Sequence, residues 1–127
     1  MNLKETLNAT GKTLIETGSP DAQLEAEVLI RHVLRIDRAT FLRDLEEPVT
    51  EYDRERLDGL VARRLRREPL NYITGFREFY GLSFEVSDGV LIPRQETELL
   101  VDTVIALARS RPKSEMKICD VGTGSGA

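Results

Sequence analysis

Three glycines at alternate positions constrain this sequence more than any other feature. They are Gly122, Gly124 and Gly126, in the stretch Asp-Val-Gly-Thr-Gly-Ser-Gly-Ala over residues 120–127. The preceding residues 116–119 alternate apolar and polar side chains, which predicts a short β-strand. A strand followed by closely spaced glycines lets a nucleotide-like ligand approach the carboxyl edge of a parallel sheet, because glycine turns sharply and has no Cβ.

This glycine loop, residues 120–127, has three interpretations. The spacing Gly122-x-Gly124-x-x-Ala127 loosely fits the dinucleotide-binding fingerprint. An aspartate two residues before three alternate glycines instead resembles the first motif of class I S-adenosylmethionine methyltransferases, whose cofactor has no pyrophosphate. A glycine-rich turn without a ligand is the third interpretation. We favour the methyltransferase interpretation.

Composition and charge narrow the class of protein. The chain has 127 residues and a net charge of −4, so it lacks the basic excess typical of nucleic-acid binding. No apolar run approaches the length of about 18 residues that a membrane span needs. The single cysteine, Cys119, excludes an internal disulfide and is typical of a reducing compartment. We expect a cytoplasmic, monomeric protein that contacts neither nucleic acid nor membrane directly.

Residues 1–75 are predicted to form an N-terminal helical domain. Apolar residues recur at helical spacing, and capping residues separate the helices. Asp37 and Thr50 are expected to cap the third and fourth helices. In the second helix, Leu24 and Leu29 are expected to be buried, while Glu25, Glu27 and Arg31 are expected to be solvated. The expected helices cover residues 3–17, 20–34, 38–43 and 51–68, and residues 70–75 are expected to leave the helix.

The pattern changes after the helices. Residues 76–94 are predicted to form a β-hairpin linker that turns at Gly81, because aromatic and alternating residues flank that glycine. Residues 95–127 are predicted to begin an α/β domain with one helix, a loop over 111–115 and the strand at 116–119. The apolar side chains of this helix are expected to be buried against the sheet: Leu99, Leu100, Val104, Ile105 and Leu107.

Three other features have a structural and a functional interpretation. His32 is the only histidine, so a structural role is favoured over a metal ligand or base. Cys119 is expected to be a buried thiol rather than a nucleophile. The basic turn, made of Arg63, Arg64, Arg66 and Arg67, is either a solvated face or a docking surface for an acidic or RNA-bound partner.

Four blocks, in this order, resemble one family. They are Pro-Leu-Asn-Tyr-Ile-Thr-Gly at 69–75, Arg-Glu-Phe-Tyr-Gly-Leu at 77–82, Gly-Val-Leu-Ile-Pro-Arg-Gln-Glu-Thr-Glu at 89–98, and the glycines at 120–126. Together they resemble the peptide chain release factor glutamine N5-methyltransferases, the PrmC/HemK family. The resemblance covers the whole chain and is specific from about Pro69 onward.

The resemblance implies a fold, a reaction and a cofactor site. The fold would be a mainly α N-terminal helical bundle, then a β-hairpin and the first helix and strand of a Rossmann-like α/β methyltransferase domain. The family transfers a methyl group from S-adenosyl-L-methionine to the glutamine side-chain amide of the Gly-Gly-Gln loop in bacterial class 1 release factors. Gln95 stands where the family usually has a second proline, which loosens the local turn. The expected cofactor-binding residues are Arg94, Thr97, Asp120, Gly122, Thr123, Gly124, Ser125 and Gly126, with Glu96 bordering the same pocket and no metal ligands.

The catalytic motif that the resemblance implies, Asn-Pro-Pro-Tyr, does not occur in residues 1–127. We therefore expect this chain to be the front of a longer enzyme and to be inactive alone. A ribosomal-protein glutamine methyltransferase is a close alternative, and a DNA adenine methyltransferase is disfavoured by the acidic balance. A non-catalytic helical module that docks a release factor is the alternative of a different class.

Overall fold

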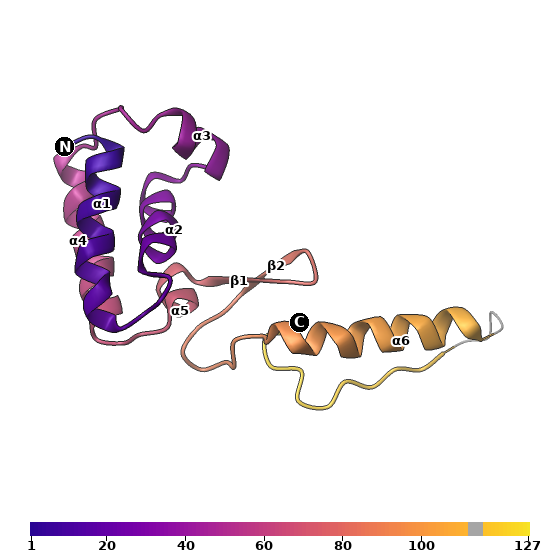
Figure 1. Cartoon of the computed structure of the whole chain (residues 1–127). Helices are drawn as coiled ribbons and strands as arrows, with labels where there is room; N and C mark the ends of the chain where they lie inside the picture. Colours follow the sequence, from indigo (N-terminus) through magenta and orange to yellow (C-terminus); the bar gives the residue numbers. More distant parts are fainter. Residues whose placement is uncertain (112–115) are drawn as a thin grey trace. The chain divides into compact units, whose positions relative to one another are not determined.

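A computed structural model describes residues 1–111 and 116–127. The chain divides into two compact units, a helical unit over Met1–Thr74 and a second unit over Gly75–Ala127. Figure 1 labels the helices and the two strands in chain order. The elements of the helical unit are α1 (Leu3–Leu14), the 3₁₀ turn η1 (Ile15–Thr17), α2 (Ala22–Leu34), α3 (Arg38–Arg43), α4 (Glu51–Leu65) and α5 (Leu70–Thr74). The second unit contains β1 (Phe76–Phe79), β2 (Leu82–Glu85), the 3₁₀ turn η2 (Gln95–Thr97) and α6 (Glu98–Ser110).

Capping side chains begin helices α3 and α4. The Asp37 carboxylate accepts a hydrogen bond from the Thr40 N–H at 2.8 Å, and the Thr50 hydroxyl accepts one from the Asp53 N–H at 3.1 Å. Both predicted caps are therefore confirmed. Such a bond satisfies one of the backbone donors that the first helical turn leaves unpaired.

The first turn of α1 is also bonded to a distant loop. The amides of Leu3 and Lys4 donate hydrogen bonds to the carbonyls of Glu47 and Leu45, at 3.0 and 2.9 Å. In the opposite direction, the Val49 amide donates a hydrogen bond to the Met1 carbonyl at 3.0 Å. The loop before α4 thereby completes the start of α1.

Apolar side chains from α1, α2, α3 and α4 meet in one core. Phe41, Leu14 and Leu29 are fully enclosed in it, and Figure 1 shows α1 and α2 side by side with α4 along them. Burial of each such side chain contributes about 1.5–3 kcal/mol relative to exposure. Leu29 is buried as predicted, whereas the predicted burial of Leu24 was wrong, because Leu24 is 51% exposed. Residues 70–74 also form the short helix α5 instead of leaving the helical conformation.

Charged side chains expected in solvent instead join the helices. Glu27 is only 8% exposed and accepts hydrogen bonds or ion pairs from Arg31 and Arg38. Glu25 is bonded by Arg64 of α4. The prediction that these glutamates are solvated was wrong because helical periodicity indicates a face and not its partners.

The basic turn is largely engaged within the helical unit. Arg63 bonds Glu68 through two nitrogens, Arg64 bonds Glu25, and Arg67 donates to the Thr17 carbonyl at 3.2 Å. Three of its four guanidiniums thus hold segments of the same unit together. The fourth, Arg66, is exposed.

The hairpin of the second unit forms at the predicted place. Strands β1 and β2 are antiparallel, with Phe79 opposite Leu82 and a two-residue turn at Tyr80 and Gly81. Both turn residues have positive φ, 51° and 73°, which is the backbone of a type I′ hairpin turn. The rings of Phe79 and Phe84 meet edge to face at 6.2 Å.

The predicted helix of the second unit is present as α6, but its burial was wrongly predicted. None of its residues is buried, and Leu99, Leu100 and Leu107 are 71%, 62% and 53% exposed. The expected sheet that would cover them is not formed by the described residues, where β1 and β2 make the one sheet. None of the described helices combines the length and the apolar character that crossing a bilayer requires.

The strand predicted at 116–119 was also wrong. Residues 116–120 have no regular secondary structure, and Cys119 is exposed rather than buried. A strand exists by pairing with a neighbour, and among the described residues nothing pairs with this segment. The loop predicted over 111–115 falls mainly on residues 112–115, which lie outside the described residues.

Candidate cofactor site

The glycine loop has a backbone that only glycine adopts readily. Gly122, Gly124 and Gly126 have φ values of +79°, +60° and +87°. A residue with a Cβ is disfavoured in this left-handed region by about 1–2 kcal/mol. The Gly126 amide donates to the Thr123 carbonyl at 3.0 Å, which closes a turn within the loop. The alternate glycines therefore coil the backbone tightly.

A cavity of about 400 Å³ lies against this loop, within the second unit. Its size falls in the range of about 300–1,000 Å³ that is usual for small-molecule sites. One side is made by the glycine loop, and the others come from the hairpin, the segment before η2, and the start of α6. The described lining residues are Phe79, Leu91, Pro93, Arg94, Thr97, Leu100, Val101, residues 120–125 and Ala127.

Most of the residues predicted from the sequence to bind a cofactor line this cavity. Arg94 and Thr97 border it although they lie more than twenty positions before the loop. Gly126 and Glu96 are not among its described lining residues. The predicted residues that line it together are Arg94, Thr97, Asp120, Gly122, Thr123, Gly124 and Ser125.

The polar lining contains two opposite charges and one unsatisfied hydroxyl. Arg94 and Asp120 are the charged residues among the described lining. The Ser125 Oγ is shielded from solvent and has no hydrogen-bond partner among the described residues. A buried hydroxyl without a partner costs free energy, which a polar ligand group would relieve. This lining suits a molecule with a zwitterionic end and hydroxyl or amine groups.

Sequence reasoning missed the apolar part of the cavity. Phe79 is 3% exposed in the hairpin, and Leu100 and Val101 come from the first turn of α6. An aromatic ring and aliphatic side chains beside polar groups are the usual surroundings of a ring-bearing ligand. The helical periodicity had assigned Leu100 to a core face, so the signal was present but was interpreted as packing.

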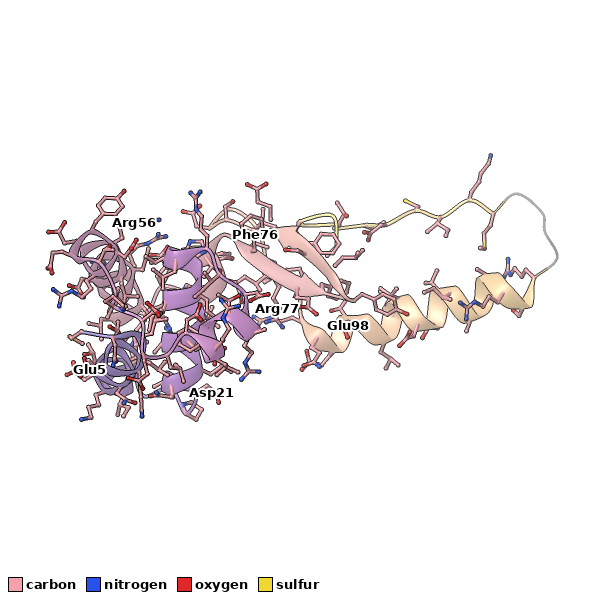
Figure 2. All side chains as sticks on the ribbon, turned by 90° about the horizontal axis from the view of Figure 1, so that it is seen from above. Glu5, Asp21, Arg56, Phe76, Arg77 and Glu98 are labelled. Atoms are coloured by element: carbon pink, nitrogen blue, oxygen red, sulfur yellow. The ribbon has the colours of Figure 1, made fainter. Side chains whose placement is uncertain are left out.

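The hairpin turn is tied to α6 by two hydrogen bonds of Tyr80. Its amide donates to Glu98 Oε1 at 2.8 Å, and its hydroxyl donates to Asp102 Oδ1 at 2.5 Å. The bond to Asp102 raises the pKa of Tyr80, and burial raises it further. Figure 2 labels Glu98 at the start of α6. The turn and the helix thus form one fixed frame beside the cavity.

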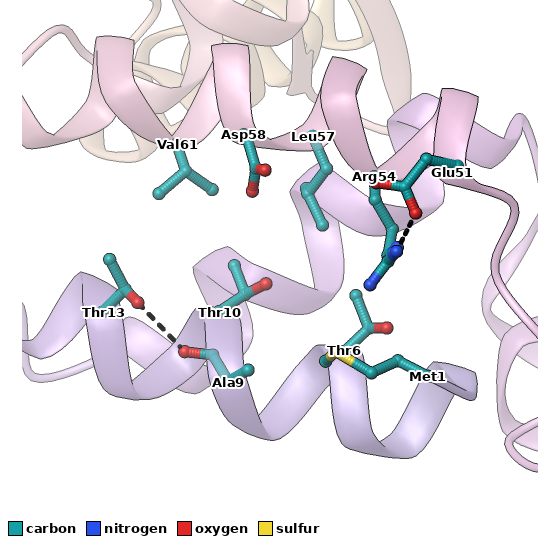
Figure 3. Close-up of a pocket in the computed structure, with 10 residues that line it drawn as sticks. All are labelled: Met1, Thr6, Ala9, Thr10, Thr13, Glu51, Arg54, Leu57, Asp58 and Val61. Atoms are coloured by element: carbon teal, nitrogen blue, oxygen red, sulfur yellow. Dashed lines mark hydrogen bonds and ion pairs between the residues drawn. The ribbon is translucent and has the colours of Figure 1, made fainter.

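A second cavity, of about 270 Å³, lies in the helical unit between α1 and α4. Figure 3 shows Thr6, Thr10 and Thr13 on one side of it and Leu57 and Val61 on the other. The Thr6 and Thr13 hydroxyls donate to carbonyls of their own helix, at 2.8 and 3.1 Å. Its described lining includes none of the predicted cofactor residues.

His32 and Cys119 do not line either cavity within the described part of the chain. Burial lowers the pKa of His32, and the guanidiniums of Arg56 and Arg35 lower it further. The two guanidiniums near the imidazole would also repel a metal cation, so its surroundings disfavour a metal site. Among residues 1–111 and 116–127, no group of three or more His, Cys, Asp or Glu side chains is arranged to hold a metal ion.

Comparison with known proteins places the chain in a family. The family described as the PrmC N-terminal domain matches residues 5–75. The release factor glutamine methyltransferase of Koribacter versatilis is 43% identical over 126 residues, which are 99% of this chain and 44% of that protein. The enzyme of the same name from Fusobacterium nucleatum is 40% identical over 121 residues, 94% of this chain and 34% of that protein.

A third relative carries a different name. The bifunctional methyltransferase of Rickettsia typhi is 38% identical over 141 aligned residues, 98% of this chain and 27% of that protein. The chain spans less than half the length of each of these three relatives. The family model matches residues 5–75, and the relatives align along nearly the whole chain. The chain therefore belongs to the PrmC family of methyltransferases and carries its N-terminal domain.

Proposed function

We propose that this chain is part of an enzyme that methylates the side-chain amide of the glutamine in the Gly-Gly-Gln loop of bacterial class 1 release factors. Residues 1–75 would be its N-terminal helical domain, 76–94 a hairpin linker, and 95–127 the start of its cofactor-binding domain. The observation that carries the proposal is the cavity that joins the glycine loop to Arg94 and Thr97. The relatives named as release factor glutamine methyltransferases support the choice of substrate.

The cofactor proposed for the cavity is S-adenosyl-L-methionine, which would supply an activated methyl group. Its amino-acid end carries one positive and one negative group, and Asp120 and Arg94 offer the complementary charges. The Ser125 hydroxyl would gain a partner among the ligand's polar groups. Phe79, Leu100 and Val101 would contact the apolar faces of the adenosyl part.

The reaction needs more than these residues. An amide nitrogen is a weak nucleophile because its lone pair is delocalised into the carbonyl, so the enzyme must orient it and stabilise the developing charge. The Asn-Pro-Pro-Tyr stretch with which the family does this is absent from residues 1–127. We therefore propose that residues 1–127 contribute cofactor binding and do not transfer the methyl group alone.

Nuclear magnetic resonance tests the cofactor part. The chain labelled with ¹⁵N is titrated with S-adenosylhomocysteine, the product form of the cofactor, while the glycine amides are followed. The amides of Gly122, Gly124 and Gly126 are expected to shift and saturate together. Those of Gly18 and Gly59, in the helical unit, are the internal control and should stay in place. Equal shifts in both groups, or none in either, would refute the cofactor site.

Mass spectrometry tests the reaction. A class 1 release factor is incubated with S-adenosylmethionine and residues 1–127, and in parallel with a relative that spans the full enzyme, such as the Koribacter versatilis protein. The full-length relative is expected to add one methyl group to the glutamine, and residues 1–127 none. Methylation of the release factor by the chain alone would contradict the proposed division of roles.

A further inference from the structure

The turn of the hairpin contains a residue that its backbone disfavours. Tyr80 has a φ of +51°, a conformation that Asn, Asp and Gly adopt far more readily in type I′ turns. Gly81, the other turn residue, fits this rule with a φ of +73°. A tyrosine at this position costs about 1–2 kcal/mol relative to glycine.

Two hydrogen bonds join this turn residue to α6. The Tyr80 amide and hydroxyl reach Glu98 and Asp102, at 2.8 and 2.5 Å. The two carboxylates are four positions apart, so they lie on the same face of the helix. Bonds to ionised acceptors are roughly twice as strong as neutral ones. One residue thus engages two successive turns of α6.

Each residue of this contact is the chain neighbour of a residue that lines the cavity. Phe79 precedes Tyr80, Thr97 precedes Glu98, and Val101 precedes Asp102. Phe79 belongs to the hairpin wall, whereas Thr97 and Val101 belong to the helical wall. The two hydrogen bonds of Tyr80 thus connect the hairpin wall to the helical wall.

We infer that Tyr80 is a positioning residue of the cofactor site: it fixes the hairpin wall against the α6 wall so that the cavity is preformed. This inference rests on the proposed cofactor function. Tyr80 does not line the cavity itself, so it acts through Phe79 and through the start of α6. Preformed walls raise affinity because less conformational freedom is lost on binding.

The test compares the affinity of S-adenosylhomocysteine for four forms of the chain, measured from the shifts of the three loop glycine amides. Tyr80→Phe removes the hydroxyl and keeps the ring, and Asp102→Ala removes the acceptor from the helix side. Each is expected to weaken binding about five- to tenfold, the loss of one charge-assisted bond. The double variant is expected to bind no more weakly than either single one, because both remove the same contact.

Two controls separate positioning from general damage. Asp102→Asn keeps an acceptor oxygen and should restore most of the affinity that Asp102→Ala loses. Tyr52→Phe makes the matched change on α4, where Tyr52 is 68% exposed, and should bind like the original chain. Circular dichroism verifies that the helices of each variant are intact. Asp102→Ala keeps the test valid if Tyr80→Phe disturbs the hairpin.

The outcomes are distinct. Original-chain affinity in both Tyr80→Phe and Asp102→Ala would overturn the positioning role and leave the cofactor site standing. Additive losses in the double variant would also overturn it, because the two groups would then act independently. No shift of the loop glycines in the original chain would refute the proposed cofactor site, and this inference with it.

Discussion

The guanidinium of Arg64 holds the carboxylate of Glu25 through two hydrogen bonds, of 2.8 and 2.9 Å. The residues are 39 positions apart, on α4 and α2, and their side chains are 17% and 12% exposed. Ser19 adds a third bond to the same carboxylate at 3.0 Å. This cluster joins two helices of the bundle and the loop before α2.

Loss of the Arg64 side chain should destabilise the helical unit. Arg64→Ala leaves the Glu25 carboxylate with one of its three bonds, and we expect the free energy of unfolding to fall by about 2 kcal/mol. Urea denaturation followed by circular dichroism measures it. Arg66→Ala is the matched control, because Arg66 is exposed on the same turn, and it should change stability by less than about 0.5 kcal/mol. Equal effects of the two substitutions would show that the cluster contributes nothing specific.

The same cluster makes stability depend on acidity. The hydrogen bond from Arg64 lowers the pKa of Glu25, an effect that burial partly opposes and that Ser19 reinforces. The contribution is complete above the ordinary glutamate pKa of about 4.3 and is lost as the pH falls through the lower pKa of the folded chain.

Urea unfolding at a series of pH values from 7 to 3 checks this dependence. Glu25→Gln removes the titrating group, so its stability should fall less steeply with acid than that of the original chain. Other carboxylates will still titrate in the variant, since the pKa values of Asp37, Asp44 and Glu68 are also lowered by hydrogen bonds. Parallel stability curves for the two chains would contradict the role of Glu25.

The start of α4 depends on Thr50. Its hydroxyl accepts a hydrogen bond from the Asp53 amide at 3.1 Å and donates one to the Asp53 carboxylate at 2.6 Å. Thr50→Ala should lower the free energy of unfolding by about 1 kcal/mol. Thr50→Ser retains the hydroxyl and should cost much less. Thermal unfolding of the three chains side by side gives the comparison, and a serine variant as unstable as the alanine one would exclude the cap as the cause.

Two glycine substitutions should have opposite effects. Gly59 lies within α4, and a Cβ there would meet no atom within 4 Å, so Gly59→Ala should stabilise the chain by about 0.5–1 kcal/mol. Gly122 also has open space around it, but its φ of +79° disfavours alanine. Gly122→Ala should therefore distort the loop and weaken binding of S-adenosylhomocysteine, measured by the amide titration. Gly59→Ala serves as its matched control, and equal affinities in the two variants would contradict the requirement for glycine.

Local signals in the sequence predicted the local structure. The caps at Asp37 and Thr50 and the hairpin turn at Gly81 each depend on a few neighbouring residues, and the structure has all three. The partner of Glu25 could not be predicted, because it lies on another helix. The strand at 116–119 failed for a related reason, since alternation identifies a segment able to pair but does not provide the neighbour.

The candidate site was predictable in its polar half. Glycines at alternate positions and the polar residues around Arg94 carry chemical signatures that stand out from packing residues. Phe79 and Val101 carry no such signature, because apolar side chains that line a cavity follow the same periodicity as those that fill a core. Only the folded unit shows which of them remain beside open space.

The hydrogen bonds between the start of α1 and the loop before α4 bear on the order in which this chain folds during synthesis. The Asn2 side chain donates a hydrogen bond to Glu46, which lies 44 positions later in the sequence. The amides of Leu3 and Lys4 donate to carbonyls of the same loop. During synthesis, the first helix emerges from the ribosome well before these partners do. The hydrogen bonds of its opening turn therefore cannot be completed until that loop has been translated.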